Sequence, residues 1–313
     1  MTTVSLPTLQ IARAALKDMR PALELVFAHL SSPGRERLVA GLLAEPGSAR
    51  CAGLWEARRE GRRAGAAWIR VQPGRIATLW PPGMLPDEPE EIADALLQAA
   101  LQEAAQEGVR LVQSLLPGGA GARGERLLRA GFEQLAELYF LVNLRQNFPL
   151  TQPRCELQYE VYSPENQGRL LRLIERTYQG SLDCPRMNQL RAVEDVLAGY
   201  LAMGTPRSRV WQLARLGSDD VGCLLLADHP RTDELEIVYL GVVPEFRGRS
   251  WGQALVAQAQ WQAHRLGRSR VSLAVDAQNH PAVALYDRLG FICWDREVAY
   301  VKALSPPAAG LAY

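Results

Sequence analysis

The sequence predicts an α/β protein built from two copies of one domain, each a mixed, twisted β-sheet flanked by helices. Three observations predict this fold class. Apolar runs of strand period alternate with stretches of helical period along the chain. The order of these runs in the first half recurs in the second half. A shift of 159 residues (267 minus 108) also lays Gly108 on Gly267, Arg129 on Arg288 and Phe132 on Phe291.

Length and composition are those of a globular protein with a neutral surface. The 313 residues are enough for two domains of ordinary size, and 48% of them are apolar. The 35 basic residues nearly balance the 34 acidic ones, so we expect neither a nucleic acid nor a membrane as partner. The first thirty or so residues lack the cationic start and apolar run of a secretory signal.

The cysteines and histidines predict neither a disulfide framework nor a metal site. The 5 cysteines and 4 histidines are scattered, without the spacing of metal ligands. We therefore expect a protein of the reducing cytoplasm that holds no metal.

The first copy is expected to span residues 1–148. Helical periods cover residues 16–30, 35–43, 92–106 and 125–130, and strand periods cover residues 51–58, 64–71, 76–80, 109–116 and 138–144.

The second copy is expected to span residues 154–305, after a connection near residues 147–153. Helical periods cover residues 169–179, 190–201 and 251–266, and strand periods cover residues 209–215, 221–226, 234–243, 270–275 and 297–304.

The stretch Arg247–Gly252 lies between a strand and a helix of the second copy. Backbone N–H groups in such a turn converge, and the helix N-terminus adds partial positive charge. Glycine allows close approach of the backbone to a ligand, and Arg247 and Arg249 add formal charge. The pattern fits an anion-binding cradle, although on its own it fits an ordinary basic turn equally well.

Two blocks together resemble the signature of the GNAT acetyltransferase superfamily. The first runs from Val242 to Gly252, and the second runs from Asn279 to Phe291. Arg247 and Gly252 match the first and last signature positions, whereas Ser250 replaces the middle glycine. The resemblance implies two tandem GNAT domains and acetyl-CoA as co-substrate, with its pyrophosphate on the first block.

The resemblance also implies which residues bind acetyl-CoA. The strand backbone at Leu240, Gly241 and Val242 would bond the pantetheine arm and supply an oxyanion donor, and Asn279 would contact the same arm. From its position alone, Asn279 is equally expected to cap a helix. The residues implied to hold the pyrophosphate are Arg247, Gly248, Arg249, Ser250, Trp251 and Gly252.

Acetyl transfer to an amine needs a base, because an alkyl ammonium with a pKa near ~10.4 is mostly charged at neutral pH. Glu236 is the candidate base, acting through a water. Strand alternation places Glu236 on one face with Val238, Leu240 and Val242. The alternative is a solvated glutamate in an exposed acidic cluster.

The departing thiolate gains from protonation, and Tyr286 is the candidate acid. It follows Asn279 by seven residues (286 minus 279), two helical turns, so both side chains would share one helix face. The alternative is a tyrosine that only packs in the core.

Two residues are candidates for the acceptor pocket, which the family builds after the first helix of the domain. Tyr178 would line the pocket, and Asp183 would hold a cationic amine. The alternative is a turn with a capping serine or aspartate. Cys184, without a histidine nearby in sequence, is expected to be a packed thiol.

The first copy differs at the cradle. The same shift places residues 88–93, with Glu88, Glu90, Glu91 and Pro89, where the second copy has arginines and glycine. Carboxylates repel a diphosphate, and proline removes a backbone donor. We therefore expect a degenerate first domain without cofactor.

The sequence thus predicts an acetyl-CoA-dependent N-acetyltransferase that acts on a small primary amine, as a monomer or homodimer. Two alternatives stay open. One is acetylation of a protein N-terminus or lysine, and the other is a non-catalytic acyl-CoA sensor or scaffold. The sequence does not identify the acceptor.

Overall fold

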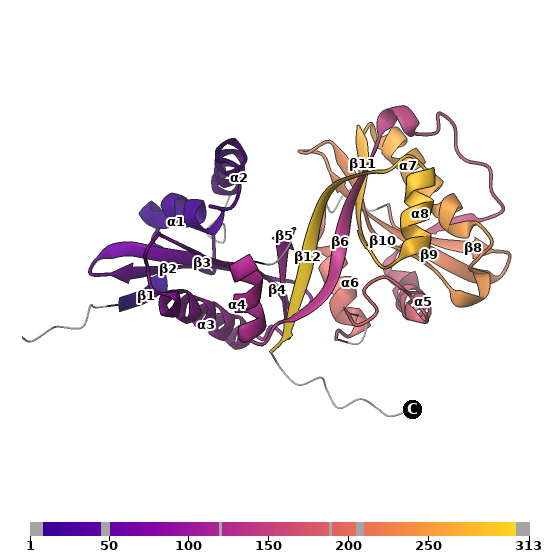
Figure 1. The fold of residues 1–313 in the computed structure, drawn as a ribbon. Coiled ribbons are helices and arrows are strands. Elements are labelled where there is room, and N and C mark those ends of the chain that lie inside the picture. The colour runs from indigo at the N-terminus through magenta and orange to yellow at the C-terminus, as the bar shows by residue number, and fades with distance from the viewer. Residues whose placement is uncertain (1–8, 45–50, 119–120, 188–189, 205–209, 305–313) are drawn as a thin grey trace, which may run out of the picture. The chain divides into compact units, whose positions relative to one another are not determined.

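This computed structural model describes residues 9–44, 51–118, 121–187, 190–204 and 210–304 (Figure 1). Two compact units divide the chain. The first unit comprises Met1–Gln134 and Ala299–Tyr313, and the second unit comprises Leu135–Val298. Each is described here by itself.

The first unit is a sheet with helices packed on it. Strands β1 to β4 pair antiparallel in sequence order, and β5 pairs parallel to β4. Helices α1 and α2 pack against Trp68, and Ile92 and Leu96 of α3 pack in a second cluster. The elements are β1 (Leu9–Arg13), α1 (Met19–Val26), α2 (Ser32–Ala44), β2 (Leu54–Arg59), β3 (Arg62–Gln72), β4 (Ile76–Met84), α3 (Glu90–Gln106), β5 (Leu111–Pro117) and α4 (Gly121–Arg129).

The second unit is a mixed sheet with strand order β12-β6-β11-β10-β9-β8-β7. On one face of the sheet, leucines and Ile174 of α5 form an apolar cluster with Val193 and Leu197 of α6. Helices α7 and α8 pack in a second, separate apolar cluster. The elements are β6 (Glu133–Leu144), β7 (Gln158–Val161), α5 (Gln167–Tyr178), α6 (Val193–Leu201), β8 (Gln212–Leu216), β9 (Asp219–His229), β10 (Glu234–Val242), α7 (Trp251–Leu266), β11 (Arg270–Asp276), α8 (His280–Arg288) and β12 (Ile292–Ala303), with short 3-10 turns η1 (Leu16–Asp18), η2 (Arg145–Asn147), η3 (Pro164–Asn166) and η6 (Pro244–Phe246).

The second unit begins at Leu135, earlier than the boundary expected after residue 148, because it includes most of strand β6. The residues of β6 from Leu138 to Leu144 pair antiparallel with β11, between β11 and β12 of the second unit. The buried Asn143 fixes this insertion, because its amide donates to Leu289 O (3.0 Å) and accepts from Gln260 (3.2 Å). The last strand of the first sequence half therefore completes the sheet of the second unit.

Strands β10 and β11 pair in parallel over a short distance only. Their register runs from Glu234↔Arg270 to Glu236↔Ser272 and then stops. On its other side, β10 stays paired with β9 up to Val242↔Gly222. Within the described ranges, the backbone of β10 beyond Glu236 therefore has no strand partner on the β11 side.

A β-bulge interrupts β10 just after this point. Ile237 pairs with Leu226 and Tyr239 pairs with Leu225, so Val238 is an extra residue. An extra residue reverses the alternation of side chains between the two faces of a sheet. Tyr239 consequently packs in the cluster with α5 and α6, whereas Leu240 packs in the cluster with α7.

The predicted elements agree with the structure where their pattern is long. Residues 251–266 form the helix predicted there, and β3, β5, β9 and β11 contain the predicted strands almost completely. Two short strands, β1 and β7, were not predicted. Strand β4 continues to Met84, past the expected end at residue 80 and through Pro81 and Pro82. Residue 209, the first of one predicted strand, lies outside the described residues.

None of the helices in the described residues combines the length and apolar character that crossing a membrane requires. No group of three or more His, Cys, Asp or Glu residues is placed in that part of the chain to hold a metal ion.

Candidate functional site

A pocket of about 370 Å³ lies in the second unit, where β10 and β11 separate. Its walls come from the segment between α5 and α6, from both strands and from the first turns of α8. The predicted site residues that line it are Tyr178, Asp183, Leu240, Gly241, Val242, Arg247, Asn279 and Tyr286.

The unpaired side of β10 forms one wall of this pocket. An unpaired strand edge presents N–H and C=O groups to which an extended chain can add. Gly241 brings this edge close to α5, because a Cβ there would lie 2.7 Å from Thr177 Cβ. The pocket therefore offers backbone hydrogen bonds to a long, thin ligand such as a pantetheine arm.

The turn after β10 has the backbone of an anion cradle. Gly248 has φ +75° and Ser250 has φ +61°, and α7 begins at Trp251. Left-handed conformation costs a non-glycine residue roughly 1–2 kcal/mol. At Gly252, a Cβ would lie 3.3 Å from Leu285 of α8, so glycine allows these helices to approach. Ser250 thus retains the conformation for which glycine is favoured.

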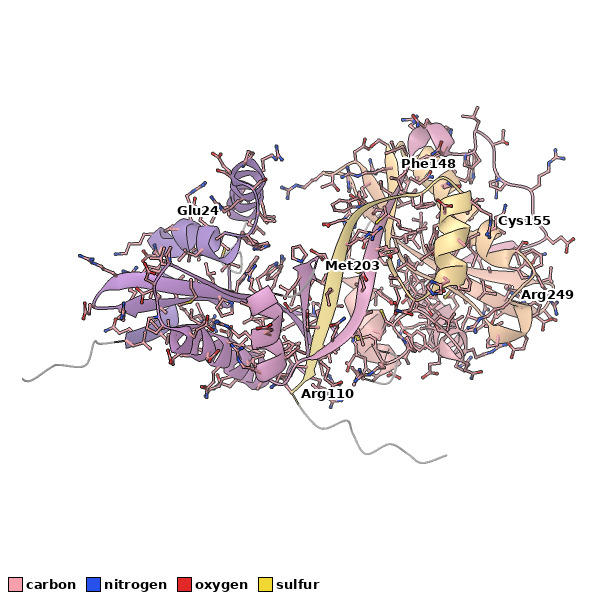
Figure 2. The ribbon with its side chains drawn as sticks, viewed as in Figure 1. Glu24, Arg110, Phe148, Cys155, Met203 and Arg249 are labelled. Carbon is pink, nitrogen blue, oxygen red and sulfur yellow. The ribbon has the colours of Figure 1, made fainter. Side chains whose placement is uncertain are left out.

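The two arginines of the turn have different environments. Arg247 donates to three backbone carbonyls, Val242 O (3.0 Å), Gly180 O (3.1 Å) and Thr177 O (2.8 Å). Its guanidinium therefore ties the end of β10 to the end of α5 and keeps positive charge at the pocket. Arg249 is exposed at the surface and lies over the ring of Phe246 (Figure 2).

Asn279 caps α8, as its position predicted, because its side-chain oxygen accepts from Ala282 N (3.4 Å). Asp183 approaches the same region. Its carboxylate accepts from Asp276 N (2.9 Å), and the Asp276 carboxylate accepts from Cys184 N (3.1 Å). The Asp183 carboxylate thus has a structural role in joining the loop to β11, while burial raises its pKa.

Tyr286 lies in the pocket wall on α8, and it packs at 5.4 Å against the ring of Phe291. Burial raises the pKa of Tyr286, and the nearby charge of Asp183 raises it further. A phenol with a raised pKa keeps its proton at neutral pH and can donate it to a stronger base formed beside it.

Glu236 does not lie in this pocket. It lines a neighbouring hollow of about 240 Å³ together with His229, Glu234, Ser272 and Trp294. The two cavities share Leu273 and Ala274 of β11 as lining residues. The structure therefore places Glu236 and Tyr286 in adjoining hollows rather than in a single one.

The predicted face of Glu236 was wrong for two of its three neighbours. Strand alternation placed Glu236 with Val238, Leu240 and Val242. Val238 packs in the cluster with Tyr239, but as an extra residue it reverses the alternation for Leu240 and Val242. Leu240 and Val242 pack in the cluster with Ile237 on the α7 side. Glu236 therefore shares its face with Tyr239.

His229 is a site residue that the sequence reasoning missed. Its Nε2 lies 2.9 Å from Glu236 Oε2. The hydrogen bond to Glu236 raises the pKa of His229, although burial opposes the shift. The hairpin of β9 and β10 could have indicated this contact. Glu234 pairs with His229 there, so Glu236 lies diagonally across from the imidazole.

Aromatic residues that were not predicted line the α5–α6 side of the pocket. Tyr239 packs edge-on against Tyr178 and parallel to Tyr200, both at 5.9 Å. The Tyr239 hydroxyl lies 2.6 Å from Thr177 Oγ1. Arg191 lines the same end of the pocket. Sequence spacing did not indicate this cluster, because its members come from three separate elements.

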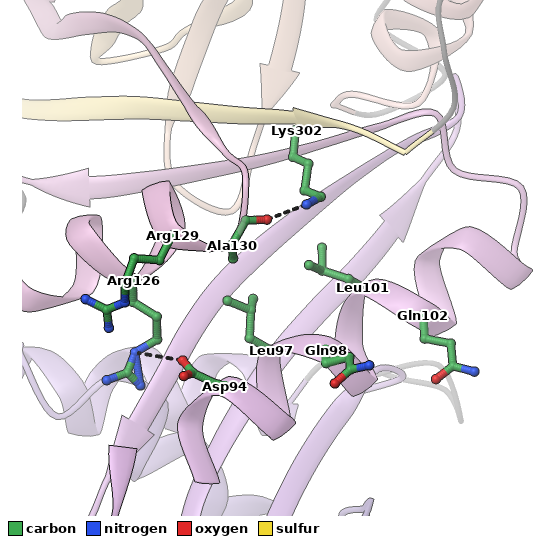
Figure 3. A pocket seen from close by; sticks show the side chains of 9 residues that line it. All are labelled: Asp94, Leu97, Gln98, Leu101, Gln102, Arg126, Arg129, Ala130 and Lys302. Atoms are coloured by element: carbon green, nitrogen blue, oxygen red, sulfur yellow. Dashed lines mark hydrogen bonds and ion pairs between the residues drawn. The ribbon is translucent and has the colours of Figure 1, made fainter. Parts of the chain in front are cut away.

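A larger hollow, about 730 Å³, lies in the first unit between α3, α4 and the end of β12 (Figure 3). Its cations already have partners within the unit. Arg126 pairs with Glu90 and Asp94, and Lys302 donates to Ala130 O. Because its charged groups are paired with one another or with the backbone, this hollow offers less chemistry than the smaller pocket of the second unit.

One known protein family matches the part of the chain that contains this pocket. The acetyltransferase (GNAT) family matches residues 172–291. Mycothiol acetyltransferase of Pseudarthrobacter chlorophenolicus is 44% identical over 72 residues, which cover 23% of this chain and 22% of that protein. Mycothiol acetyltransferase of Arthrobacter sp. (strain FB24) is 43% identical over 107 residues, 33% and 30% of the two chains. The matches thus span about a fifth to a third of the curated relatives.

Solved structures share the fold along the whole chain. A GCN5-related N-acetyltransferase from Sphaerobacter thermophilus has a TM-score of 0.64 at 17% identity, covering 96% of this chain and 97% of that one. A tandem GNAT protein from the clavulanic acid biosynthesis pathway has a TM-score of 0.53 at 15% identity, covering 96% and 99%. The predicted fold class, an α/β protein with the layout of two tandem GNAT domains, is confirmed.

The left-handed backbone at Ser250 leads to a stability prediction. Replacing Ser250 by glycine removes the steric cost of φ +61°, so we expect the free energy of unfolding to rise by roughly 1 kcal/mol. Denaturant unfolding measures this free energy. Ser218→Gly is the control, because Ser218 is exposed and does not have a positive φ. Equal effects of both substitutions would contradict the assignment of strain to Ser250.

Proposed function

Because this chain carries a domain of the acetyltransferase (GNAT) family, we propose that it transfers an acetyl group from acetyl-CoA to the primary amine of a small molecule. One observation carries the proposal. The pairing of β10 with β11 stops at Glu236↔Ser272 and leaves a backbone edge inside a pocket that also contains Asn279 and Tyr286. A thioester lying along this edge would reach both adjoining hollows.

Acetyl-CoA binding is assigned to the edge and to the turn that follows it. The backbone of Leu240, Gly241 and Val242 bonds the pantetheine arm, and Asn279 contacts it from α8. The pyrophosphate lies on the turn Arg247–Gly252, where backbone N–H groups and the start of α7 favour negative charge. A backbone N–H of the β10 edge stabilises the oxyanion.

The proposed chemistry assigns one proton to each side of the site. Glu236, paired with His229, takes a proton from the acceptor ammonium through a water, and the neutral amine attacks the thioester carbon. The carbon–sulfur bond then breaks, and the nitrogen loses its second proton to solvent. Tyr286 gives its proton to the departing thiolate and afterwards regains one from solvent. The products are an N-acetyl amine and coenzyme A.

Cavity size favours a small acceptor over a protein segment. The hollow that contains Glu236 measures about 240 Å³. The mycothiol acetyltransferases make their acceptor a second candidate for this chain, because identity reaches 44% over 72 residues. Acetylation of a protein N-terminus or lysine would need an extended groove beside Glu236.

The first unit is proposed to hold no cofactor. Its β4 and β5 also pair over three positions only, from Ile76↔Leu111 to Thr78↔Gln113. Beyond them, Pro81 and Pro82 lack N–H donors, and Arg123 donates to Pro81 O and Val26 O (both 3.0 Å). The edge of β4 thus has few N–H donors, and Arg123 already binds one of its carbonyls. The acidic residues are weaker obstacles, because Glu88 pairs with Arg59 and Glu90 with Arg126.

Calorimetric titration with acetyl-CoA should find one site per chain. We expect Arg247→Glu to lose it, because the substitution reverses the charge beside the cradle and removes three bonds to backbone carbonyls. Arg176→Glu is the matched control, since Arg176 lies on the same side of the unit but does not line the pocket. Two sites in the wild type would contradict the proposal for the first unit.

Replacing Tyr286 by phenylalanine should lower kcat roughly 10²- to 10⁴-fold, the usual contribution of a positioned acid, and leave acetyl-CoA affinity nearly unchanged. Steady-state kinetics and calorimetry measure the two quantities. Tyr159→Phe serves as control, because the Tyr159 hydroxyl contacts Cys155 and Ala254 instead. Unchanged turnover in Tyr286→Phe would remove Tyr286 from the mechanism.

The pair formed by His229 and Glu236 predicts a pH dependence. Because the pKa of His229 is raised, its proton leaves only above the usual range of histidine, and the base form of the pair appears there. We expect kcat/KM to rise with pH through this value and His229→Gln to shift the profile to lower pH. By linkage, the stability that His229 contributes is present below about pH 6.5 and is lost as pH rises through the raised pKa. Identical pH profiles of both proteins would exclude the pair.

A further inference from the structure

Arg191 is a cation in the pocket that forms no ion pair with a carboxylate of the described residues. It lies just before α6 and lines the α5–α6 end of the pocket beside Tyr178 and Tyr200. Its Nη2 donates to Asp195 O (3.1 Å), whereas its Nε is buried without a hydrogen-bond partner in the described part of the chain. A guanidinium carries five N–H donors, so much of this group's hydrogen-bonding capacity is left for a ligand.

Other arginines of this protein with low exposure are paired. Arg268 binds the Asp228 carboxylate through Nε (2.5 Å) and Nη2 (3.0 Å), and Arg63 binds both Asp18 and Glu56. Arg123 has no carboxylate, but backbone carbonyls and His29 occupy its guanidinium. For Arg191, no ion pair occurs among the described residues. Burial lowers the pKa of Arg191, although the charge of Asp195 opposes the shift.

The surroundings of Arg191 suit a bound anion. Burial raises the pKa values of Tyr178 and Tyr200, so both phenols stay protonated and add no negative charge beside the guanidinium. Asp183 lines the same pocket, but one of its carboxylate oxygens accepts from Asp276 N. An unpaired buried cation is costly, and the cost is offset when a ligand supplies a carboxylate with planar, bidentate geometry.

We propose that Arg191 forms an anion subsite and that the acceptor amine carries a carboxylate group bound by this guanidinium. The inference rests on the proposed function, because it names the class of acceptor for the same pocket. The acceptor is then an amino acid or a short peptide, with its carboxylate at Arg191 and its amine directed toward the opening between β10 and β11. Arg191 acts as a specificity-determining residue.

The test uses common L-amino acids, each compared with its carboxamide, as acceptors with acetyl-CoA. For the preferred acid, we expect kcat/KM to exceed that of the amide roughly tenfold to hundredfold, the size of one charge-assisted pair. Arg191→Gln should reduce the ratio to about one, with a much larger loss for the acid than for the amide, and Arg191→Lys should restore part of the ratio. Equal losses for acid and amide, or no preference in any wild-type pair, would overturn the proposal.

Two further experiments test the Arg191 subsite separately from the proposed acetyl transfer. Succinyl-CoA is compared with acetyl-CoA on one amide, because a carboxylate on the acyl group could bind Arg191 instead. An Arg191-dependent preference for succinyl-CoA would overturn the assignment to the acceptor. Calorimetric titration of the same acids and amides into the protein with CoA needs no turnover. Arg191-dependent binding of the acid without acetylation would leave the subsite standing and refute the proposed function.

Discussion

The short parallel pairing of β10 and β11 is the constraint on which the site depends. Hydrogen bonds join the two strands only up to Glu236↔Ser272, and the strands separate beyond that pair. Longer pairing would close the pocket and occupy the edge of Leu240, Gly241 and Val242. The separation persists because both strands are held from outside, β10 by β9 and β11 by β6 over residues 138–144. Insertion of β6 therefore supports the opening as well as the core.

The bulge at Val238 determines which side chains meet at this opening. Without the extra residue, Leu240 would share a face with Glu236, and the α7 cluster would lose two of its aliphatic contacts. With it, the acid that pairs with His229 and the aromatic ring of Tyr239 lie on the same face. One residue of backbone irregularity thus permits an apolar contact with α7 and a polar site on the opposite face of one strand.

The parts of this structure that sequence could predict are those encoded locally. Helix α7 has a continuous helical period and ends at Gly267, and Asn279 has both the residue type and the position of a cap. The bulge could not be predicted, because it depends on the register between β10 and β9. The pairing of His229 with Glu236 needs the hairpin register, and Arg191 acquires its significance only when Tyr178 and Tyr200 are found around it. Strand β6 looked like the end of its own copy because strand pattern does not identify the partner strand.

The two copies differ in what occupies the strand edge that separation leaves. In both, a parallel pair ends after three positions and leaves a strand edge. In the first copy, Pro81 and Pro82 have no N–H groups to donate along that edge, and the guanidinium of Arg123 donates to Pro81 O. In the second, Arg247 binds Val242 O at the far end of the edge and leaves the middle of it facing the pocket. The two edges have the same topology but differ in which carbonyl an arginine binds. That position decides whether the edge stays free for a ligand.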